Sequence, residues 1–570
     1  MTLTASRRSF AAGLAAATAA LAASPAIAEA RRSGRYDTIV RRGTVFDGLG
    51  GEGREADVGI IGDRIAAIGN LAGARGTLEI DARGQAVAPG FINMLSWATE
   101  SLIEDGRSQS DIRQGVTLEV MGEGSSMGPL SPEMKARERR EQGDIRFDIG
   151  WTTLGQYLTF LEAKGVSCNV ASFVGATTLR THEVGYDDVR ATPDQLRRMQ
   201  DLVRAEMRAG ALGIGSSLIY APGNFANTDE LVALTQAAAE FGGSYISHMR
   251  SEAERYLESI DELLEIGRRA KARVQIYHIK PAGRENWHKA DLALASLDAA
   301  RRAGIDVSAN LYTYTAGSTG LYATMPLWVQ QGGHDAWVAR LKDPAIRARV
   351  LAEMRGVPKG WENLLYNTGS PEGVLLIGFK NPALKPLTGK TLAQVAAMRG
   401  TSPEDTIIDL VIEDDSRVDA AFFLMSEENI KKNIRWPWTM LGSDAGSMAP
   451  EGKFMLKNTH PRAYGNFARF LGKYIRDEQV ISLAEGIRRL TSLPAQQAGI
   501  RGRGRLAAGY AADVVVFDPA KIADTATYDK PHSYAVGVSD VLVNGTAVLR
   551  GGDHTDARPG RFVKGPGWRG

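Results

Sequence analysis

Two histidines and two acidic residues stand at the ends of short apolar runs, where their types and spacing could build a metal-dependent catalytic site. His248 and His278 end two successive runs, Asp444 ends a later run, and Glu123 follows an earlier one. The chain has only 8 histidines, so two at consecutive run ends favour a shared role. Imidazole nitrogens together with carboxylate oxygens form a ligand set that zinc prefers. Asp444 would act as a general base toward a metal-activated water, although a helix-capping role would also explain an aspartate there.

These side chains can meet only if the runs that carry them are strands of one barrel that end at the same face. Strand-like runs alternate with helical patterns such as the one that begins at Thr192-Pro193 and ends at Gly210. The runs lie near residues 89–94, 115–121, 168–174, 212–216, 243–248, 272–279, 305–311 and 439–443. Eight such units predict an α/β fold, a (β/α)8 TIM barrel, whose reactive residues sit at the carboxyl ends of the strands.

The barrel is expected over residues 89–499, with one addition inside it and one outside. The gap between the seventh and eighth runs is too long for a plain connection. It predicts a helical insertion at about 322–435, before the last barrel strand, and such insertions often form lids. Short β-like segments with turn signals occur at 36–88 and 500–560. They predict a small β-sandwich domain built from both chain ends.

The first residues have the pattern of an export signal. Arg7 and Arg8 form a twin-arginine pattern, an Ala- and Leu-rich stretch follows, and a small-x-small cleavage signal ends at Ala28. The apolar stretch is too short to span a bilayer. We therefore predict a twin-arginine signal peptide over residues 1–28, read by the twin-arginine export machinery. The mature chain is expected in the periplasm or outside the cell, without membrane insertion.

Composition favours an enzyme for small molecules over a nucleic-acid-binding protein. The 68 basic residues balance 66 acidic ones, and a net charge of +2 gives little attraction to nucleic acid or to anionic lipid. Cys168 is the single cysteine, so no intrachain disulfide can form. Its place at the start of an apolar run predicts a buried small side chain.

Several short motifs occur along the chain in the same order as in a known protein family. One begins the first predicted barrel strand, Ala88-Pro89-Gly90-Phe91-Ile92. The others are His248-Met249-Arg250-Ser251-Glu252, the stretches 278–287 and 311–319, Gly442-Ser443-Asp444, the stretch 460–465, and Gly504-Arg505-Leu506. The first resembles the amidohydrolase superfamily, and the others resemble its N-acyl-D-amino-acid deacylase (D-aminoacylase) branch. The resemblance implies hydrolysis of the amide bond of a small-molecule N-acylated D-amino acid.

The resemblance also implies roles for individual residues. His248 and His278 would be metal ligands, and Asp444 the general acid/base. A planar guanidinium can grip a carboxylate with two hydrogen bonds, which suits a pocket for the substrate carboxylate. The residues that would line this pocket are Lys280, Tyr312, Ser318 and Arg462. A surface ion pair is the alternative for the arginine, and a core aromatic the alternative for the tyrosine.

The chain departs from the family at two ligand positions. The superfamily usually carries a His-x-His pair after the start of the first strand, where this chain has Leu95 and Trp97. D-aminoacylases carry a ligating cysteine after the second strand, where this chain has Gly122-Glu123-Gly124-Ser125, and Glu123 stands one residue before the cysteine position. Trp97 would either fill the place of a second metal or serve as a filler of the barrel core.

We therefore expect one divalent cation, most naturally Zn²⁺, held by Glu123, His248 and His278. Glu119, inside the second strand, is the weaker alternative for the carboxylate ligand. Two other functions stay open. One is a related amidohydrolase acting on a cyclic amide or a peptide-like substrate, which the predicted carboxylate pocket disfavours. The other is a non-catalytic binding protein that has lost its metal, which the joint presence of the two histidines and Asp444 disfavours.

Overall fold

The computed structural model describes residues 25–569 of the chain. The predicted signal peptide therefore lies outside the described residues, apart from its last four positions. Those four belong to helix α2 (Pro25–Ser33), whose Ile27 is buried against Tyr36, Ile39 and Ala66 of the following strands. The export signal itself stays a prediction.

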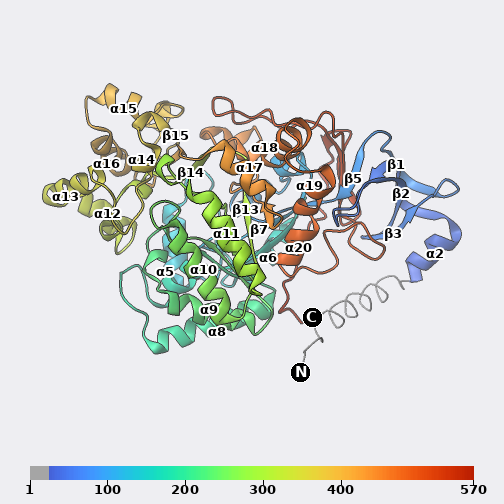
Figure 1. The fold of residues 1–570 in the computed structure, drawn as a ribbon, viewed down its shortest axis with the longest axis horizontal. Helices are drawn as coiled ribbons and strands as arrows, with labels where there is room; N and C mark the ends of the chain where they lie inside the picture. Colours follow the sequence, from blue (N-terminus) through green and yellow to red (C-terminus); the bar gives the residue numbers. More distant parts are fainter. Residues whose placement is uncertain (1–24, 570) are drawn as a thin grey trace.

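Within residues 25–569, parallel strands form a closed barrel, which confirms the predicted TIM-barrel fold (Figure 1). Its strands are β6 (Phe91–Asn93), β7 (Val116–Met121), β8 (Asn169–Ser172) continued by β9 (Val174–Gly175), β10 (Gly213–Ser217), β11 (Ser244–His248), β12 (Val274–Ile276), β13 (Val307–Leu311) and β17 (Thr439–Leu441). Each strand overlaps a run predicted from the sequence. The barrel closes between β17 and β6, where the amide of Met94 donates to the carbonyl of Leu441 at 3.1 Å.

Helices follow the strands as the alternating pattern predicted. In chain order they are α3 (Ser101–Glu104), α4 (Gln109–Ile112), α5 (Pro132–Glu141), α6 (Leu154–Lys164), α7 (Ala176–Glu183), α8 (Pro193–Ala209), α9 (Thr228–Ala239), α10 (Tyr256–Ala270), α11 (Lys289–Arg302), α17 (Glu427–Arg435), α18 (Arg462–Arg469), α19 (Leu483–Leu490) and α20 (Ser492–Gln497). In α8 a capping box between Thr192 and Gln195 satisfies the first amides, and Gly210 ends the helix with a left-handed φ of 115°.

Side chains from the strands fill the barrel interior. Ile92, Leu118, Ile246 and Met440 belong to one buried apolar cluster, so the barrel is a packed core rather than a pore. Cys168 is fully buried beside β8, as predicted. The chemistry must therefore lie at an end of the barrel and not inside it.

Segments from both chain ends form one sheet beside the barrel, at the right of Figure 1. Its strands are β1 (Arg35–Val45), β2 (Arg54–Ile61), β3 (Arg64–Gly69), β4 (Arg75–Asp81), β5 (Ala86–Pro89), β18 (Val514–Phe517), β19 (Val538–Val543), β20 (Thr546–Arg550) and β21 (Asp553–His554). Antiparallel pairing of β5 with β18 joins the two ends, with Val514 opposite Pro89. Residues after β21 return to the barrel, where the amide of Val170 donates to the carbonyl of Arg561.

The insertion before β17 lies at the end of the molecule opposite the β1–β5 strands (Figure 1). It contains α12 (His334–Leu341), α13 (Pro344–Arg355), α14 (Leu364–Thr368), α15 (Leu392–Arg399) and α16 (Pro403–Asp414). It also contains an antiparallel sheet in the order β14 (Ala316–Gly320), β16 (Asp419–Phe423), β15 (Val374–Gly378), which the sequence pattern did not predict. The sequence of β14, Ala-Gly-Ser-Thr-Gly, has no apolar alternation that would indicate a strand.

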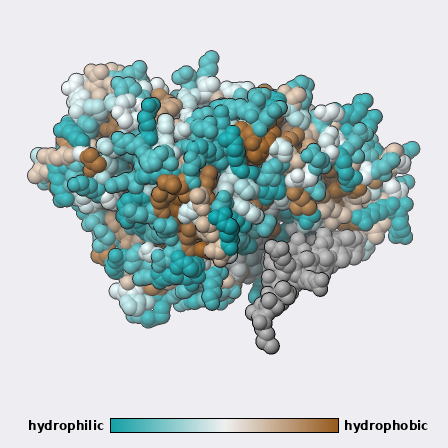
Figure 2. Space-filling view, viewed as in Figure 1, coloured by the Kyte–Doolittle hydropathy of each residue, from teal (hydrophilic) through white to brown (hydrophobic). Residues whose placement is uncertain are grey.

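The face of the molecule in Figure 2 is mainly hydrophilic, with hydrophobic residues in separate small groups. Across residues 25–569, none of the helices combines the length and the apolar character needed to cross a membrane.

Candidate active site

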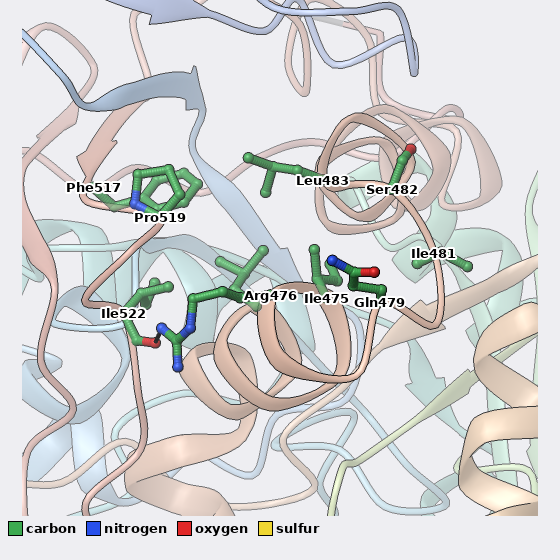
Figure 3. Close-up of a pocket in the computed structure, with 10 residues that line it drawn as sticks. Ile475, Arg476, Gln479, Ile481, Ser482, Leu483, Phe517, Pro519 and Ile522 are labelled. Carbon is green, nitrogen blue, oxygen red and sulfur yellow. Dashed lines mark hydrogen bonds between the residues drawn. The ribbon is translucent and has the colours of Figure 1, made fainter.

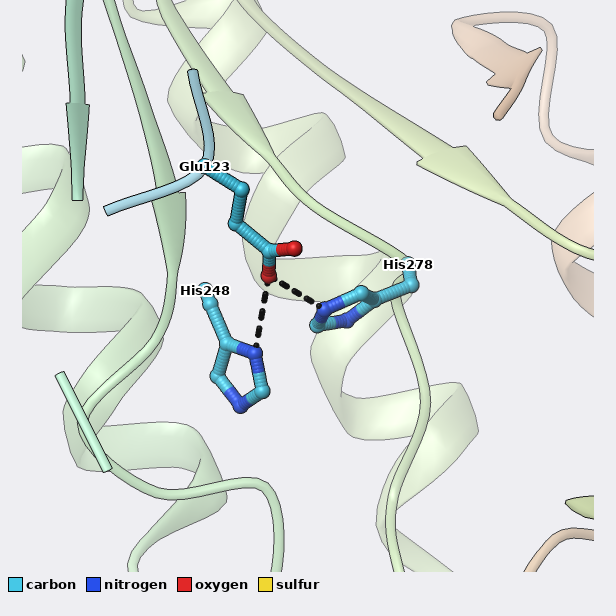
Figure 4. Close-up of side chains that lie close together, drawn as sticks. All are labelled: Glu123, His248 and His278. Carbon is cyan, nitrogen blue, oxygen red and sulfur yellow. Dashed lines mark hydrogen bonds and ion pairs between the residues drawn. The ribbon is translucent and has the colours of Figure 1, made fainter. Parts of the chain in front are cut away.

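Three predicted ligands meet at the carboxyl ends of β7, β11 and β12. Oε1 of Glu123 lies 3.0 Å from Nδ1 of His248 and 2.9 Å from Nε2 of His278 (Figure 4). His248 is the last residue of β11, and His278 follows β12 with a left-handed φ of 34°. One ligand atom from each residue lies within 4.8 Å of the other two, and all three side chains are buried.

Two glycines turn Glu123 toward the histidines. Gly122 and Gly124 have φ values of 105° and 68°, which L side chains rarely adopt. A Cβ at position 124 would lie 2.4 Å from the Cβ of Ser217, so no cysteine side chain fits there. The carboxylate at position 123 therefore supplies the negative group that a ligand at position 124 cannot.

The three side chains fit a divalent cation. Zinc takes nitrogen and oxygen ligands at about 2.0–2.2 Å, so two ligands of one tetrahedral ion are roughly 3.4 Å apart. The Glu123 oxygen lies 2.9–3.0 Å from each histidine nitrogen, and a shift of a few tenths of an ångström would admit the ion. One carboxylate with two imidazoles is also a donor set of catalytic zinc sites.

Glu252 contacts each of the two histidines at the ring nitrogen that does not face Glu123. Its Oε1 lies 3.0 Å from Nδ1 of His278 and 2.6 Å from Nζ of Lys280, and its Oε2 lies 3.7 Å from Nε2 of His248. A carboxylate behind a ligand histidine fixes the ring and its tautomer. Glu252 therefore orients the ligands without belonging to the ligand cluster. Its spacing of four residues from His248 was the only sequence signal for this role.

Charges in the site keep Glu123 ionised. Burial alone would raise the pKa of its carboxyl, but hydrogen bonds from His248 and His278 outweigh burial and hold that pKa well below its usual range. Burial lowers the pKa of His248. The pKa of His278 rises to about 9, because Glu252 and Glu123 outweigh burial and the Lys280 charge. An anionic carboxylate between two imidazoles favours a cation in this place.

Asp444 lies beside the ligand cluster, at the carboxyl end of β17. It has a left-handed φ of 52°, and its amide donates to the carbonyl of Leu95 at 2.8 Å. Its Oδ2 lies 2.9 Å from a terminal guanidinium nitrogen of Arg462. Burial raises the pKa of Asp444, Arg462 opposes the rise and Glu123 adds to it. A carboxyl with a raised pKa next to a candidate metal centre suits a group that accepts and returns a proton.

Leu95 and Trp97, which replace the superfamily's histidines, have different environments. Leu95 is 1% exposed and belongs to the barrel core. Trp97 is 41% exposed, and its indole nitrogen donates to Oε2 of Glu123 at 2.9 Å and to Oδ1 of Asp444 at 3.1 Å. The indole therefore contacts both functional carboxylates, which the core-filler alternative does not explain.

The four predicted substrate-binding residues lie around one another. The guanidinium carbon of Arg462 lies 4.4 Å from the centroid of the Tyr312 ring, and the ammonium nitrogen of Lys280 lies 5.6 Å from the same centroid. Arg462 also donates to the carbonyl of Ser318 at 3.4 Å, which places β14 at the site. Nε of Arg462 is buried without a polar partner among the described residues, whereas its buried Nη1 is the nitrogen that forms the ion pair with Asp444.

Glu119 lies in a separate buried cluster. Its Oε2 accepts a hydrogen bond from Asn93 at 2.9 Å, and Asn93 also contacts Asp111 and Ser443. Burial raises the pKa of Glu119 to about 7, although hydrogen bonds from neighbouring side chains oppose the shift. Among the described residues, Glu119 forms no hydrogen bond or ion pair with the two histidines, so Glu123 is the better ligand candidate.

The insertion reaches the site through Glu362, which the sequence did not indicate. Its Oε1 accepts hydrogen bonds from the hydroxyl of Ser251 at 2.6 Å and from the amides of Glu252 and Ala253. These residues follow β11 and carry Glu252 toward the histidines. The insertion is thus tied to the segment that orients the metal ligands.

A cavity of about 390 Å³ lies elsewhere, between the segment after α18 and the sheet near β18 (Figure 3). It is lined mainly by apolar side chains such as Leu471, Ile475 and Phe517, and Arg476 on its wall is paired with Asp477. No acid, base or metal ligand of the candidate site lines it, so we assign it no part in the chemistry.

Comparison with known proteins places this geometry in context. The Amidohydrolase family model matches residues 170–549. D-aminoacylase of Alcaligenes xylosoxydans xylosoxydans is 33% identical over 532 residues, which are 93% of this chain and 97% of that protein. The solved N-acyl-D-glutamate deacylase of Bordetella bronchiseptica, complexed with zinc and a phosphonate mimic of the tetrahedral intermediate, is 30% identical. Its TM-score is 0.77, with 93% of this chain and 100% of that chain covered. A structure addressing the binuclear metal centre of D-aminoacylase, with one-metal activation and second-metal attenuation, has a TM-score of 0.77, 32% identity and the same coverage.

Proposed function

Because the chain belongs to the amidohydrolase family, in its N-acyl-D-amino-acid deacylase branch, we propose that it hydrolyses the amide bond of N-acylated D-amino acids. The observation that carries this proposal is the meeting of Glu123, His248 and His278 next to the Asp444–Arg462 pair. This set combines a cation site, a proton carrier and an anion-binding group.

The proposed cofactor is one divalent cation, with Zn²⁺ as the ion of choice, held by Glu123, His248 and His278. When bound, the ion would polarise the scissile carbonyl and make a water molecule more acidic. A single ion is proposed because Leu95 and Trp97 offer no ligand atoms, whereas D-aminoacylase has a binuclear centre. Glu252 would keep His278 oriented toward the ion, because its Oε1 lies 3.0 Å from Nδ1 of His278 and also accepts from Lys280, which contacts the same Nδ1 at 2.8 Å.

Asp444 would move the proton. One of its carboxylate oxygens would take a proton from the attacking water, and the protonated carboxyl would then give it to the leaving amine nitrogen. Arg462 and Trp97 each hold one oxygen of Asp444, which fixes the plane of the carboxylate. The raised pKa of Asp444, caused first by burial, makes the protonated form accessible during turnover.

Arg462 would also bind the substrate carboxylate. Its Nε is buried without a polar partner among the described residues, its Nη1 pairs with Asp444, and its guanidinium packs against the Tyr312 ring. A free carboxylate would satisfy Nε, and Lys280 adds a second positive charge nearby. Cyclic imides lack a free carboxylate, so this pocket favours N-acylated amino acids over cyclic amides.

A substrate panel tests the proposal. Zinc-loaded protein is assayed with N-acetyl-D-amino acids, their L enantiomers and hydantoins. The proposal predicts turnover of D substrates, with L substrates and hydantoins at least about 100-fold slower. Faster hydrolysis of hydantoins would favour the cyclic-amide reading, and zinc binding without any turnover would favour a binding protein.

The predicted leader supports a further proposal, that the enzyme is exported through the twin-arginine route and acts in the periplasm or outside the cell.

A further inference from the structure

The indole of Trp97 bridges the two functional carboxylates. Its single N–H faces Oε2 of Glu123 at 2.9 Å and Oδ1 of Asp444 at 3.1 Å, so the two oxygens share one donor. The other oxygen of Glu123 contacts the histidines, and the other oxygen of Asp444 contacts Arg462. Each carboxylate therefore has one oxygen directed at its own functional partner and one directed at Trp97.

A donor at this point has a physical purpose. Two ionised carboxylates close together in a poorly solvated site repel each other, and a cation or a shared N–H between them reduces that repulsion. Neither Leu95 nor Trp97 can bind a cation through its side chain. Of the two, only Trp97 directs a hydrogen-bond donor to the place where the carboxylates face each other.

The burial of the two residues excludes a simple packing role for Trp97. A filler of the barrel core should be buried, as Leu95 is at 1% exposure. Trp97, two residues later, is 41% exposed, yet its polar atom points to the carboxylates. Its ring contributes little to the core, while its nitrogen makes both of its polar contacts inside the site.

We propose that Trp97 is a positioning residue that takes the place of a second cation: its N–H holds Glu123 and Asp444 together, and its ring closes that place to a metal ion. The site would consequently load one ion and stay at one ion in excess metal. The kinetic part of this inference rests on the proposed function. The metal-binding part does not, because it concerns only which ions the folded chain holds.

The number of zinc ions per chain tests directly whether the space between Glu123 and Asp444 is closed to a second ion. Wild type, Trp97→Phe and Trp97→His are equilibrated with excess zinc, dialysed against metal-free buffer and analysed by plasma mass spectrometry. We expect one zinc per chain in wild type and in Trp97→Phe, where two carboxylate oxygens alone form a poor site. We expect a second zinc in Trp97→His, because an imidazole there joins Glu123 and Asp444 as a third ligand.

A second zinc in wild type that Asp444→Asn abolishes would overturn the inference, since the place would then be open. A single zinc in Trp97→His would overturn it as well, since the place would not be a cation site at all. Neither result depends on whether a substrate has been found.

Kinetics test the positioning role. Trp97→Phe keeps an aromatic ring but removes the N–H together with the pyrrole part of the indole, so we expect kcat to fall about 10- to 100-fold with KM changed less than about threefold. Trp568→Phe is the matched control, because Trp568 is 49% exposed and lies at the chain end. Thermal unfolding of both variants should match wild type. Unchanged kcat in Trp97→Phe, or an equal loss in Trp568→Phe, would refute the positioning role. Absence of turnover in wild type would instead count against the proposed function.

Discussion

Replacement of Glu123 by glutamine tests which carboxylate holds the cation. The substitution keeps the shape of the side chain and an oxygen that can accept from Trp97, but it removes the charge between His248 and His278. The Lys280 ammonium, 2.8 Å from Nδ1 of His278, then faces the histidines with Glu252 as the carboxylate that contacts it. The site becomes more positive by one unit, which opposes the binding of a divalent ion.

The expected loss follows from the burial of the group. Removing one partner of a buried charge pair costs about 3–5 kcal/mol, which corresponds to roughly 100- to 4,000-fold in affinity. Zinc affinity is measured by competition with a chromophoric chelator, and metal content by plasma mass spectrometry after dialysis. Glu123→Gln should lose its zinc on dialysis, whereas wild type should keep it.

Glu119→Gln is the matched control, because Glu119 is also a buried carboxyl and lies inside β7, the barrel strand that Glu123 follows. It contacts Asn93 rather than the histidines, so its variant should keep zinc. Full metal content in Glu123→Gln, or loss of metal from Glu119→Gln with Glu123→Gln unaffected, would refute the ligand assignment.

Three further predictions concern proton transfer, stability and export. Asp444→Asn should keep its zinc and lose about 10²- to 10⁴-fold in kcat, measured with the best D substrate, because the amide cannot carry the proton; comparable kcat would exclude Asp444 as the general acid/base. The pKa of Glu362 is raised to about 7, first by burial and then by Glu252, so its folded form binds more protons than its unfolded form between pH 4.5 and 7. Its contribution to stability is present at low pH and falls as the pH rises through that window, so Glu362→Gln should gain stability relative to wild type from pH 5 to pH 8. Thermal unfolding across this range measures the difference, and a pH-independent difference would contradict it. Replacing both Arg7 and Arg8 by lysine should leave the unprocessed precursor in the cytoplasm, as fractionation and intact mass would show; normal export of that variant would contradict the leader prediction.

The fold was predictable because its signals are local and repeated. Apolar runs separated by capped helices predicted the barrel strands, and Thr192, Pro193 and Gly210 marked both ends of one helix. Strand β14 was not predicted from the sequence, because its small residues form a strand only by pairing with β16, where Ser318 lies opposite Ala421. Pairing with a segment about a hundred residues away leaves no periodicity in the sequence.

The site was predictable to the extent that its residues end strands. His248, His278 and Asp444 could be placed from that rule, and the histidines do meet Glu123. Glu252 and Glu362 could not, because their roles depend on how the segment after β11 folds against the insertion. The direction of the Trp97 nitrogen was equally invisible, since a sequence shows the residue type but not the two carboxylates that its N–H reaches.

The central claim is that one zinc held by Glu123, His248 and His278 supports hydrolysis of N-acylated D-amino acids. The most direct measurement adds zinc stepwise to the chelator-treated, folded protein while the rate on an N-acetyl-D-amino acid is followed. The account predicts a rate that rises with zinc and levels off at one equivalent, with no comparable rate on the L enantiomer. A zinc-independent rate, a rise that continues to a second equivalent, or no turnover at any zinc level would contradict it.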